Sequence, residues 1–413
     1  MKIRTIKQIK NLKNKRVLVR VDFNVPIKNG AVTEDVRLLA SIPTIEYLLK
    51  KGAKVILVSH LGRPEGVDKK LSLEPVAERL KEIFNFKFLI FKQFLISEFS
   101  NYFETMKKEI EKMKSGQVLM LENIRFFEGE RKNDKKFAKE LAGLADYFVL
   151  DGFAVAHRDS PSVSGVAKYI PAYAGLLLEK EIVGLSKALV KPKRPFVLVL
   201  GGAKMETKIP VLKNLLPKVD YVLIGGGIFN TYLWAKGYDV GKSLIDEKCK
   251  KQVLALLKSK KVVLPVDIVV GRGTGNWERV VLAGSVIGVR PARNASKLAC
   301  VAGGSSEAIY DIGPQTIRLY AKYIKQAQTI VWNGAMGYFE QKPYDVGTMS
   351  IARLVASRSK GRAFGIIGGG ETLQSMEQVK MTEFVDLVST GGGAMLEFLG
   401  GKVLPGVKAV VKK

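Results

Sequence analysis

The sequence predicts an α/β fold with two doubly wound parallel-sheet (Rossmann-like) domains that face each other across a cleft. Apolar, β-branched runs alternate with amphipathic stretches along the chain, which is typical of a parallel sheet covered by helices on both faces. In the second half, four apolar runs end abruptly in glycine clusters. These runs are FVLVLGG (196–202), YVLIGGG (221–227), AFGIIGGGE (363–371) and FVDLVSTGGG (384–393).

The alternation of elements also predicts where the domains begin and end. The first domain spans residues 1–170, and a helix over 171–190 connects it to a second domain over 191–385. Residues 386–413 form a C-terminal segment near the hinge that returns toward the first domain. Within the first domain we expect strands at 16–21, 54–60, 117–123 and 147–153, with helices at 36–52, 73–84 and 137–145. The Phe- and Lys-rich stretch 86–116 has no clear periodicity.

Composition limits the possible classes of protein. The 413 residues are enough for two cores, and the net charge of +28 is strongly basic. Because the lysines are spread along the chain rather than gathered in an arm, they favour anionic ligands in general. Cys249 and Cys300 lack metal-ligand spacing and are interpreted as ordinary, partly buried residues. The sequence has neither a secretory signal nor an apolar run of about 20 residues, so a cytoplasmic protein is expected.

Polar and charged residues follow the predicted strands of the first half. They come from four separate strand exits plus Arg37, and a parallel sheet brings such exits together along one edge. Arginine presents a planar fork that suits carboxylate and phosphate oxygens, so the set predicts a cationic pocket. Any one of these arginines alone could be a surface residue, and His157 is interpreted as structural. The set comprises Asp22, Asn24, Arg37, His60, Arg63, Arg125 and Arg158.

The glycine clusters of the second half predict a different kind of site. Without Cβ atoms, backbone N–H groups can approach an anion at a helix N-terminus. Single glycine turns also serve helix starts and tight turns, but four at one sheet edge favour a phosphate-rich ligand. A cationic pocket in one domain and a polyphosphate site in the other together indicate phosphoryl transfer across the cleft.

Seven motifs in order make the chain resemble the phosphoglycerate kinase family from end to end. They are RVDFNVP (20–26), SHLGRPEG (59–66), LENIRF (121–126), LGGAKMETK (200–208), IVWNGAMGYFE (330–340), IIGGGET (366–372) and STGGGAMLEFLGGKVLPGV (389–407). The resemblance implies a magnesium-dependent reaction of 1,3-bisphosphoglycerate with ADP that gives 3-phosphoglycerate and ATP. It also implies small-molecule substrates and, in most members of the family, a monomer.

The resemblance assigns roles to matching positions in this chain. The seven residues of the first half match the triose-binding positions, and Lys204 and Lys208 match lysines near the transferred phosphoryl group. Arg37, Lys204, Lys208 and the N–H groups of Gly370 and Gly393 are expected to surround that group in flight. Nucleotide contacts are expected from Gly202, Lys204, Lys208, Gly226, Asn333, Glu340, Gly368, Gly369, Gly370, Glu371 and Thr372, with Glu340 at the ribose and Glu371 at the metal.

Several positions depart from the family pattern. Glu371 stands where an aspartate usually follows the three glycines, which changes the reach of the carboxylate toward magnesium. Ala335 replaces a common proline, and Thr207 replaces the usual aspartate of the lysine motif. Gly152 and Ala154 also differ from the more common residues there. None of these changes removes a group that the chemistry needs.

The reaction itself shapes the remaining expectations. The acceptor oxygen is already anionic, so no general base is required, and catalysis should rest on positioning and electrostatic stabilisation. Sites on separate domains imply that the cleft closes, with residues 171–190 and the VLPGV segment as hinge elements. A basic nucleic-acid-binding protein would leave the glycine turns unexplained. A nicotinamide-dependent dehydrogenase would need a G-x-G-x-x-G pattern that GGG at 225–227 does not provide.

Overall fold

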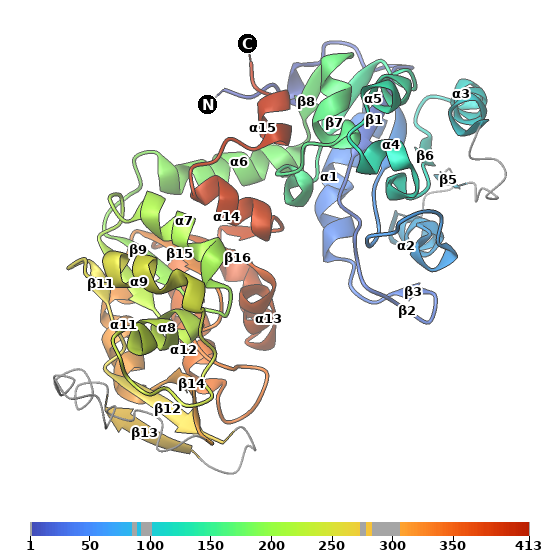
Figure 1. The fold of residues 1–413 in the computed structure, drawn as a ribbon. Helices are drawn as coiled ribbons and strands as arrows, with labels where there is room; N and C mark the ends of the chain where they lie inside the picture. The colour runs from blue at the N-terminus through green and yellow to red at the C-terminus, as the bar shows by residue number, and fades with distance from the viewer. Residues whose placement is uncertain (1, 85–88, 92–100, 273–277, 283–305, 413) are drawn as a thin grey trace. The chain divides into compact units, whose positions relative to one another are not determined.

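The computed structural model describes residues 2–84, 89–91, 101–272, 278–282 and 306–412. The chain divides into two compact units, each with its own parallel sheet (Figure 1). Unit 1 comprises Met1–Val183 and Val403–Lys413, and unit 2 comprises Gly184–Lys402.

The sheet of unit 1 has six parallel strands in the order β5-β6-β4-β1-β7-β8. Its central strand β1 (RVLVR) is buried over four of its five residues, as expected for a strand covered on both faces. The chain runs from β1 to one side of the sheet and later returns to its other side, so the order reverses next to β1. The strands are β1 (Arg16–Arg20), β4 (Lys54–Val58), β5 (Leu89–Phe91), β6 (Val118–Met120), β7 (Tyr147–Leu150) and β8 (Ala172–Ala174).

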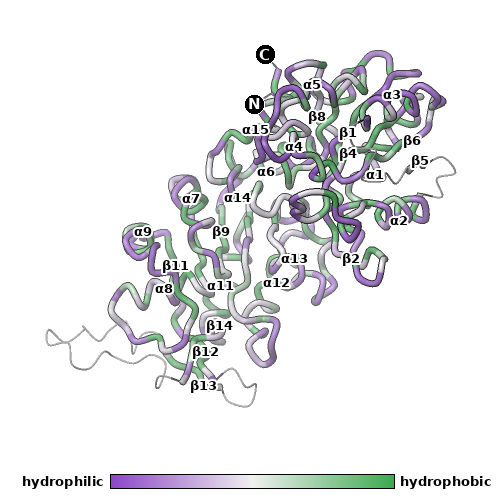
Figure 2. Tube along the Cα trace, turned by 45° about the vertical axis from the view of Figure 1, so that its right-hand side comes forward, coloured by the Kyte–Doolittle hydropathy of each residue, from purple (hydrophilic) through white to green (hydrophobic). Residues whose placement is uncertain are grey.

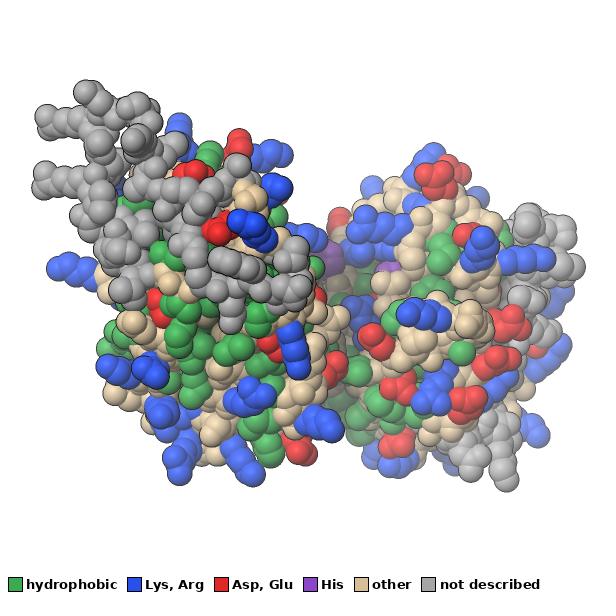
Figure 3. Space-filling view, turned by 90° about the horizontal axis from the view of Figure 1, so that it is seen from below, with side chains coloured by type: hydrophobic (Ala, Val, Ile, Leu, Met, Phe, Trp, Pro, Cys, Tyr) green, Lys and Arg blue, Asp and Glu red, His purple; other side chains and the backbone are tan. Residues whose placement is uncertain are grey.

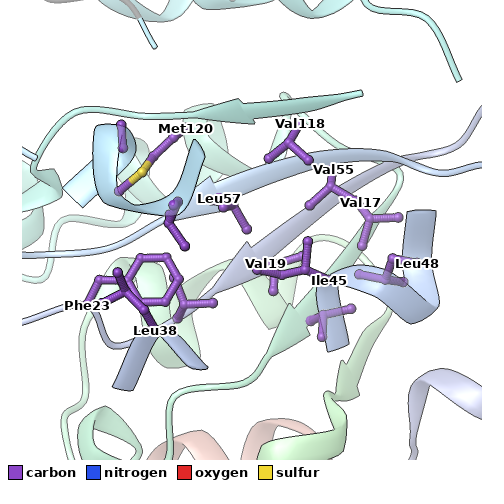
Figure 4. Packing of buried hydrophobic residues seen from close by; sticks show 14 of the residues in the cluster. Val17, Val19, Phe23, Leu38, Ile45, Leu48, Val55, Leu57, Val118 and Met120 are labelled. Carbon is purple, nitrogen blue, oxygen red and sulfur yellow. The ribbon is translucent and has the colours of Figure 1, made fainter. Parts of the chain in front are cut away.

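Apolar side chains from alternate strand positions join helices α1 and α2 in the core on one face of this sheet. Val17 and Val19 pack with Ile45 and Leu48 of α1, and Figure 4 shows the cluster from close by. Burying such side chains contributes about 1.5–3 kcal/mol each. The helices of unit 1 are α1 (Val36–Lys50), α2 (Glu74–Phe84), α3 (Tyr102–Lys112), α4 (Glu128–Arg131), α5 (Lys135–Ala142) and α15 (Pro405–Ala409), with a short hairpin of β2 (Ile27–Lys28) and β3 (Ala31–Val32).

The sheet of unit 2 also has six parallel strands, in the order β11-β10-β9-β15-β16-β17. This order runs outward in both directions from the neighbours β9 and β15, so the carboxyl ends of those two strands form the switch point where ligands bind in doubly wound folds. The strands are β9 (Phe196–Leu200), β10 (Tyr221–Ile224), β11 (Val262–Val263), β15 (Thr329–Asn333), β16 (Phe364–Gly368) and β17 (Leu387–Ser389).

Helices cover both faces of this second sheet. Helices α11, α12 and α13 pack together over one core cluster, whereas α7 contacts α9 and α14. Surface helices such as α2 and α9 carry a mixture of hydrophobic and hydrophilic residues (Figure 2), as one-sided burial requires. The helices of unit 2 are α6 (Leu176–Leu189, which begins in unit 1), α7 (Met205–Leu215), α8 (Gly226–Ala235), α9 (Lys250–Leu256), α11 (Pro314–Gln326), α12 (Val346–Ser359), α13 (Gly370–Gln378) and α14 (Gly393–Leu399).

An antiparallel sheet, which the sequence did not predict, interrupts the alternation in unit 2. Its order is β13-β12-β14, with bounds β12 (Asp267–Gly271), β13 (Glu278–Leu282) and β14 (Ala308–Ile312). The short strand β8 was missed as well. All four glycine clusters lead into helices.

The last residues of the chain divide differently from the predicted boundary at residue 385. Strand β17 pairs with β16, and α14 packs on α7, so residues 386–402 lie within unit 2. Only the segment from Val403 belongs to unit 1, where the N–H of Gly406 donates to the carbonyl of Ala156. Of the two cysteines, Cys249 is buried with its Sγ 3.2 Å from Asp246 Oδ2, and Cys300 lies outside the described residues. No helix in the described part of the chain is long and apolar enough to span a bilayer.

A buried carboxylate holds the first turn of α6. The Oδ1 of Asp151 accepts hydrogen bonds from Thr44 Oγ1 at 2.8 Å and from the Leu177 N–H at 3.0 Å. A Cβ at Gly175 would lie 2.0 Å from the same oxygen, so only glycine fits there. Burial raises the pKa of Asp151 to about 7, and these hydrogen bonds counteract the rise only in part.

We expect the Asp151→Asn variant to lose a pH dependence that the natural protein has. The folded-state pKa of about 7 exceeds the ordinary value of 3.8, so the folded protein holds a proton there that the unfolded chain releases. The contribution of Asp151 to stability is therefore present at low pH and is lost as pH rises between those two values. When urea unfolding is measured at both pH values, the free energy of unfolding should fall from pH 4 to pH 8 by about 2–4 kcal/mol more in the natural protein than in the variant. If the free energies of unfolding of the two proteins differed by the same amount at both pH values, the raised pKa of Asp151 would be contradicted.

Candidate active site

Three residues meet just past the central strands of the unit 1 sheet. Asp22 follows β1, His60 follows β4, and Arg37 lies in the first turn of α1. One Asp22 oxygen accepts a hydrogen bond from Arg37 Nη1 at 2.6 Å, and the other lies 3.7 Å from His60 Nδ1. The nearly buried carboxylate thus fixes the half-exposed guanidinium at the carboxyl edge of the sheet.

His60 is buried among cations and is neutral at physiological pH. Its pKa lies well below the ordinary value because burial disfavours the charged ring and because Arg20, Arg158 and Arg37 repel it. Arg20 Nη2 donates to His60 Nδ1 at 3.2 Å, which leaves the ring proton on Nε2. His60 can therefore donate one hydrogen bond to an anionic ligand without adding charge.

The remaining predicted residues of unit 1 join the same edge. Gly62 links two of them, because its N–H donates to Asn24 Oδ1 at 2.8 Å and its carbonyl accepts from Arg125 Nη1. Burial lowers the pKa of Arg158, and repulsion by Arg63 lowers it further. The structure thus brings together all seven residues of the predicted set. Beside them, the Nδ1 of His157 is buried without a hydrogen-bond partner in the described part of the chain.

Beneath this edge lies a buried polar network that the sequence did not predict. Arg20, the last residue of β1, is 2% exposed, and its Nε donates to Ser162 Oγ at 2.9 Å. Ser162 Oγ in turn donates to Glu130 Oε1 at 2.7 Å. Burial raises the pKa of Glu130, whereas the charge of Arg20 opposes that rise. An arginine directly after three apolar strand residues was the available signal, but its partner lies more than 100 residues away.

The glycine turns of unit 2 lie at the carboxyl edge of its sheet. The Gly202 N–H donates to the Ala335 carbonyl at 2.6 Å, and the Gly226 N–H donates to the Met336 carbonyl at 2.8 Å. A Cβ at Gly201 would lie 2.0 Å from the Ala335 oxygen, so these turns pack too closely for any side chain there. Backbone groups therefore form the wall of this edge.

A lysine and a glutamate converge on Gly202. A Cβ at that position, where φ is +78°, would lie 2.7 Å from Lys208 Nζ and 2.5 Å from Glu371 Oε2. Lys208 is buried in the first half of α7, and its pKa is lowered by burial and by Lys204, while Glu371 opposes the shift. Lys204 lies at the exposed N-cap of the same helix.

Asn333 and Thr372 connect β15 to the glycine turn before α13. Asn333 Nδ2 donates to the Gly368 carbonyl, and the Gly334 N–H donates to Thr372 Oγ1 at 2.7 Å. Gly369 takes φ of +96°, which only glycine adopts readily, and Gly370 begins α13. Gly393 begins α14, whose Met395 packs against Gly368.

A pocket of about 270 Å³ lies against these turns. Gly202, Gly226, Glu340 and Glu371 all contribute to its wall, so four of the predicted nucleotide contacts share one cavity. The opposite wall includes Ala308–Tyr310 of β14, which belongs to the unpredicted antiparallel sheet. The rings of Tyr310 and Tyr338 lie there with centroids 5.9 Å apart. Sequence alone carried no signal for this wall.

Comparison with known proteins decides which family has this arrangement. The family profile described as phosphoglycerate kinase matches residues 6–402. The chain belongs to the phosphoglycerate kinase family. The phosphoglycerate kinase of Pelotomaculum thermopropionicum is 44% identical over 418 residues, covering 99% of each chain. That of Dictyoglomus turgidum is 44% identical over 409 residues, covering 98% of this chain and 97% of its relative.

Two solved phosphoglycerate kinase structures share the fold. The structure from Coxiella burnetii matches with a TM-score of 0.82 at 39% identity and covers 99% of this chain and 100% of its own. The structure from Pyrococcus horikoshii OT3 matches with a TM-score of 0.80 at 32% identity, with 99% and 98% coverage. The chain is thus a kinase of the two-domain, Rossmann-like α/β type.

The residues that depart from the family pattern are accommodated by their immediate neighbours. Glu371 Oε2 accepts from the N–H of Ala335 at 3.3 Å, so the longer carboxylate and the alanine lie side by side. Thr207 Oγ1 donates to the Lys204 carbonyl at 2.9 Å within the first turn of α7. A Cβ at Gly152 would lie 3.0 Å from the Asp22 nitrogen, which is tight for any larger residue.

Cationic side chains are spread over one face of the molecule rather than gathered in a single stripe. Lysine and arginine side chains are distributed over the face seen in Figure 3, with acidic side chains among them. Polyanion-binding proteins instead gather cations on one patch or arm. The charge distribution and the family together leave the nucleic-acid and dehydrogenase alternatives without support.

Proposed function

We propose that the chain catalyses the reversible transfer of the acyl phosphate of 1,3-bisphosphoglycerate to ADP, giving 3-phosphoglycerate and ATP. One observation carries the proposal for this member of the family. An arginine cluster lies at the carboxyl edge of one sheet, and a glycine-walled pocket with Lys208 and Glu371 lies at the carboxyl edge of the other.

The arginine cluster supplies what a small phosphorylated carboxylate needs. Guanidinium groups bind carboxylate and phosphate oxygens through paired hydrogen bonds. Asp22 holds Arg37 at 2.6 Å and neutralises part of the charge, so the pocket is fixed before the substrate arrives. Neutral His60 adds a directional donor, and we assign Arg63, Arg125 and Arg158 to the remaining substrate oxygens.

The glycine-walled pocket is assigned to the nucleotide. Glu340 shares that pocket with the glycine turns, so a carboxylate can accept from ribose hydroxyls while N–H groups in the first turns of α8 and α13 meet phosphates. We place Lys204, Lys208 and the N–H groups of Gly370 and Gly393 around the transferring phosphoryl group. Charge builds on its equatorial oxygens during transfer, and fixed cations and N–H groups stabilise that charge.

Glu371 fits the magnesium ion that such nucleotides carry. The described residues contain no group of three or more acidic, histidine or cysteine side chains that could hold a metal alone. Magnesium in kinases is bound by one or two carboxylates together with substrate phosphates, which a single glutamate beside the phosphate turns satisfies. When bound, the ion would neutralise developing phosphate charge.

The acceptor is the carboxylate of 3-phosphoglycerate in one direction and the terminal phosphate of ADP in the other. Both are already anionic, so the residues have to orient and stabilise rather than remove a proton. Closure of the cleft would also exclude water, which would otherwise hydrolyse the acyl phosphate. The domain closure expected from the sequence stays a prediction.

A coupled assay tests the proposal directly. We expect ATP to form from ADP and 1,3-bisphosphoglycerate only when the purified chain and magnesium are both present, and EDTA to abolish its formation. The reverse reaction should consume ATP and 3-phosphoglycerate, with glycerate as an inactive control that lacks the phosphate. ATP formation that is absent, or equally fast without 1,3-bisphosphoglycerate, would overturn the proposal.

A further inference from the structure

A second pocket opens at the opposite edge of the unit 2 sheet. Its volume is about 400 Å³, and it lies where β15 and β16 begin rather than where they end. The end of α6, the turn before β16 and the residue before β17 complete its wall. Each of these strands has five residues, so about 16 Å of sheet separates this basal pocket from the glycine turns.

The charge around the basal pocket is strongly unbalanced. Four cationic residues line it, whereas Asp386 is its only acidic lining residue among those described. One oxygen of Asp386 already accepts a hydrogen bond from the Gly365 N–H at 2.8 Å. The cationic residues are Lys187, Lys191, Lys193 and Arg362.

The four cationic side chains make no hydrogen bonds or ion pairs that would stabilise the described part of the fold. In the described part of the chain, none of the four side chains forms a hydrogen bond or an ion pair, and Lys187 only lies over the Phe364 ring at 4.2 Å. Neighbouring arginines behave differently. Arg194 pairs with Asp220, and Arg358 Nε donates to the Ala327 carbonyl at 2.8 Å. The cations at the pocket are therefore the ones left available to a ligand.

Two ordinary explanations cover only part of this arrangement. Cations near helix C-termini offset the helix dipole, and α6 and α12 both end close by at Leu189 and Ser359. That effect belongs to the last turn of a helix, whereas Lys193 and Arg362 lie beyond the helices in the loops that follow. Scattered surface lysines would also not converge from separate segments on one cavity.

We propose that the basal pocket binds a compact multivalent oxyanion, meaning a molecule with two or more phosphate or sulfate groups. The cations come from two separate segments of the pocket wall, the end of α6 with the loop after it and the turn before β16. A diphosphate or triphosphate can bridge both sides of the pocket. A volume of about 400 Å³ lies within the range of small-molecule sites. This site is separate from the proposed catalytic one and does not depend on it.

Inorganic tripolyphosphate and site-resolved NMR of the full chain provide the test. The backbone amides of Gly361 and Gly365 report on the basal pocket even if tripolyphosphate also enters the arginine cluster or the glycine pocket. We expect both signals to shift and saturate, with no comparable change in sodium chloride of equal ionic strength. A Lys191→Ala, Lys193→Ala, Arg362→Ala variant should weaken the apparent affinity at least about tenfold.

The matched control removes three cations from elsewhere in unit 2. Lys248→Ala, Lys251→Ala and Lys258→Ala together change the net charge equally at exposed positions around α9. We expect that variant to keep the affinity within about twofold, because distant exposed charges are screened. Equal weakening in both variants, or shifts that never saturate, would overturn the proposal. If the first variant does not fold, the single change Lys191→Glu replaces it under the same criteria.

Discussion

Replacing Lys208 by alanine is expected to lower turnover by about 10²–10³-fold, the loss typical when one fixed group that stabilises transition-state charge is removed. Lys208 is buried beside Gly202 and Glu371, so its ammonium is held in place before the phosphates arrive. A steady-state assay in the direction of ATP formation measures the effect. The affinity for 3-phosphoglycerate should stay within about twofold, because its proposed site lies in unit 1 and uses no residue of α7.

Folding should not obscure this result. The pKa of Lys208 is lowered mainly by burial, which means that burying the charged ammonium costs free energy. Removing the side chain should therefore not destabilise unit 2. Lys213→Ala supplies the matched control, because Lys213 lies in the last turn of the same helix and is exposed. That variant should keep normal turnover. Turnover of Lys208→Ala within about threefold of the natural protein would exclude the assigned role.

The convergence of unit 1 residues could be predicted because parallel topology makes it necessary. Asp22 and His60 follow adjacent strands β1 and β4, whose paired register places their exits side by side. A strand pattern and a short polar motif therefore suffice to place both at one edge. Arg37 lies in the first turn of α1, the first helix after β1, which the chain reaches through the β2–β3 hairpin.

The support beneath that edge depends on contacts that no local pattern records. Ser162 lies 142 positions from Arg20 and 32 from Glu130, and each of these polar groups resembles an ordinary surface residue in sequence. The wall of the glycine-walled pocket in unit 2 could not be predicted for the same reason. Tyr310 reaches the pocket from an antiparallel sheet whose pairing is set by β12, so the parallel rhythm of the chain gave no indication of it.

Arg20→Met is expected to lower the free energy of unfolding of unit 1 by about 3–5 kcal/mol, because it leaves the buried carboxylate of Glu130 without the nearby buried charge that offsets it. The methionine keeps much of the volume but leaves Glu130 buried with only serine partners and the Ser162 N–H. Urea unfolding followed by circular dichroism measures the change. Arg16→Met is the matched control on the same strand, because Arg16 is 36% exposed and pairs with Asp146 at the surface. Its loss should cost about 0–1 kcal/mol.

Two further measurements separate the effect of the Arg20 charge on Glu130 from mere loss of packing. If the buried charge of Glu130 causes the loss, the double variant Arg20→Met, Glu130→Gln should recover at least about half of it, because the unpaired carboxylate is gone. Arg20 also lowers the pKa of His60, so that pKa should rise in Arg20→Met. Proton NMR can follow this directly, since the chain contains only two histidines. An unchanged His60 titration together with no recovery in the double variant would show that Arg20 acts through packing alone. In that case its charge would not be what holds the carboxyl edge of the unit 1 sheet in place.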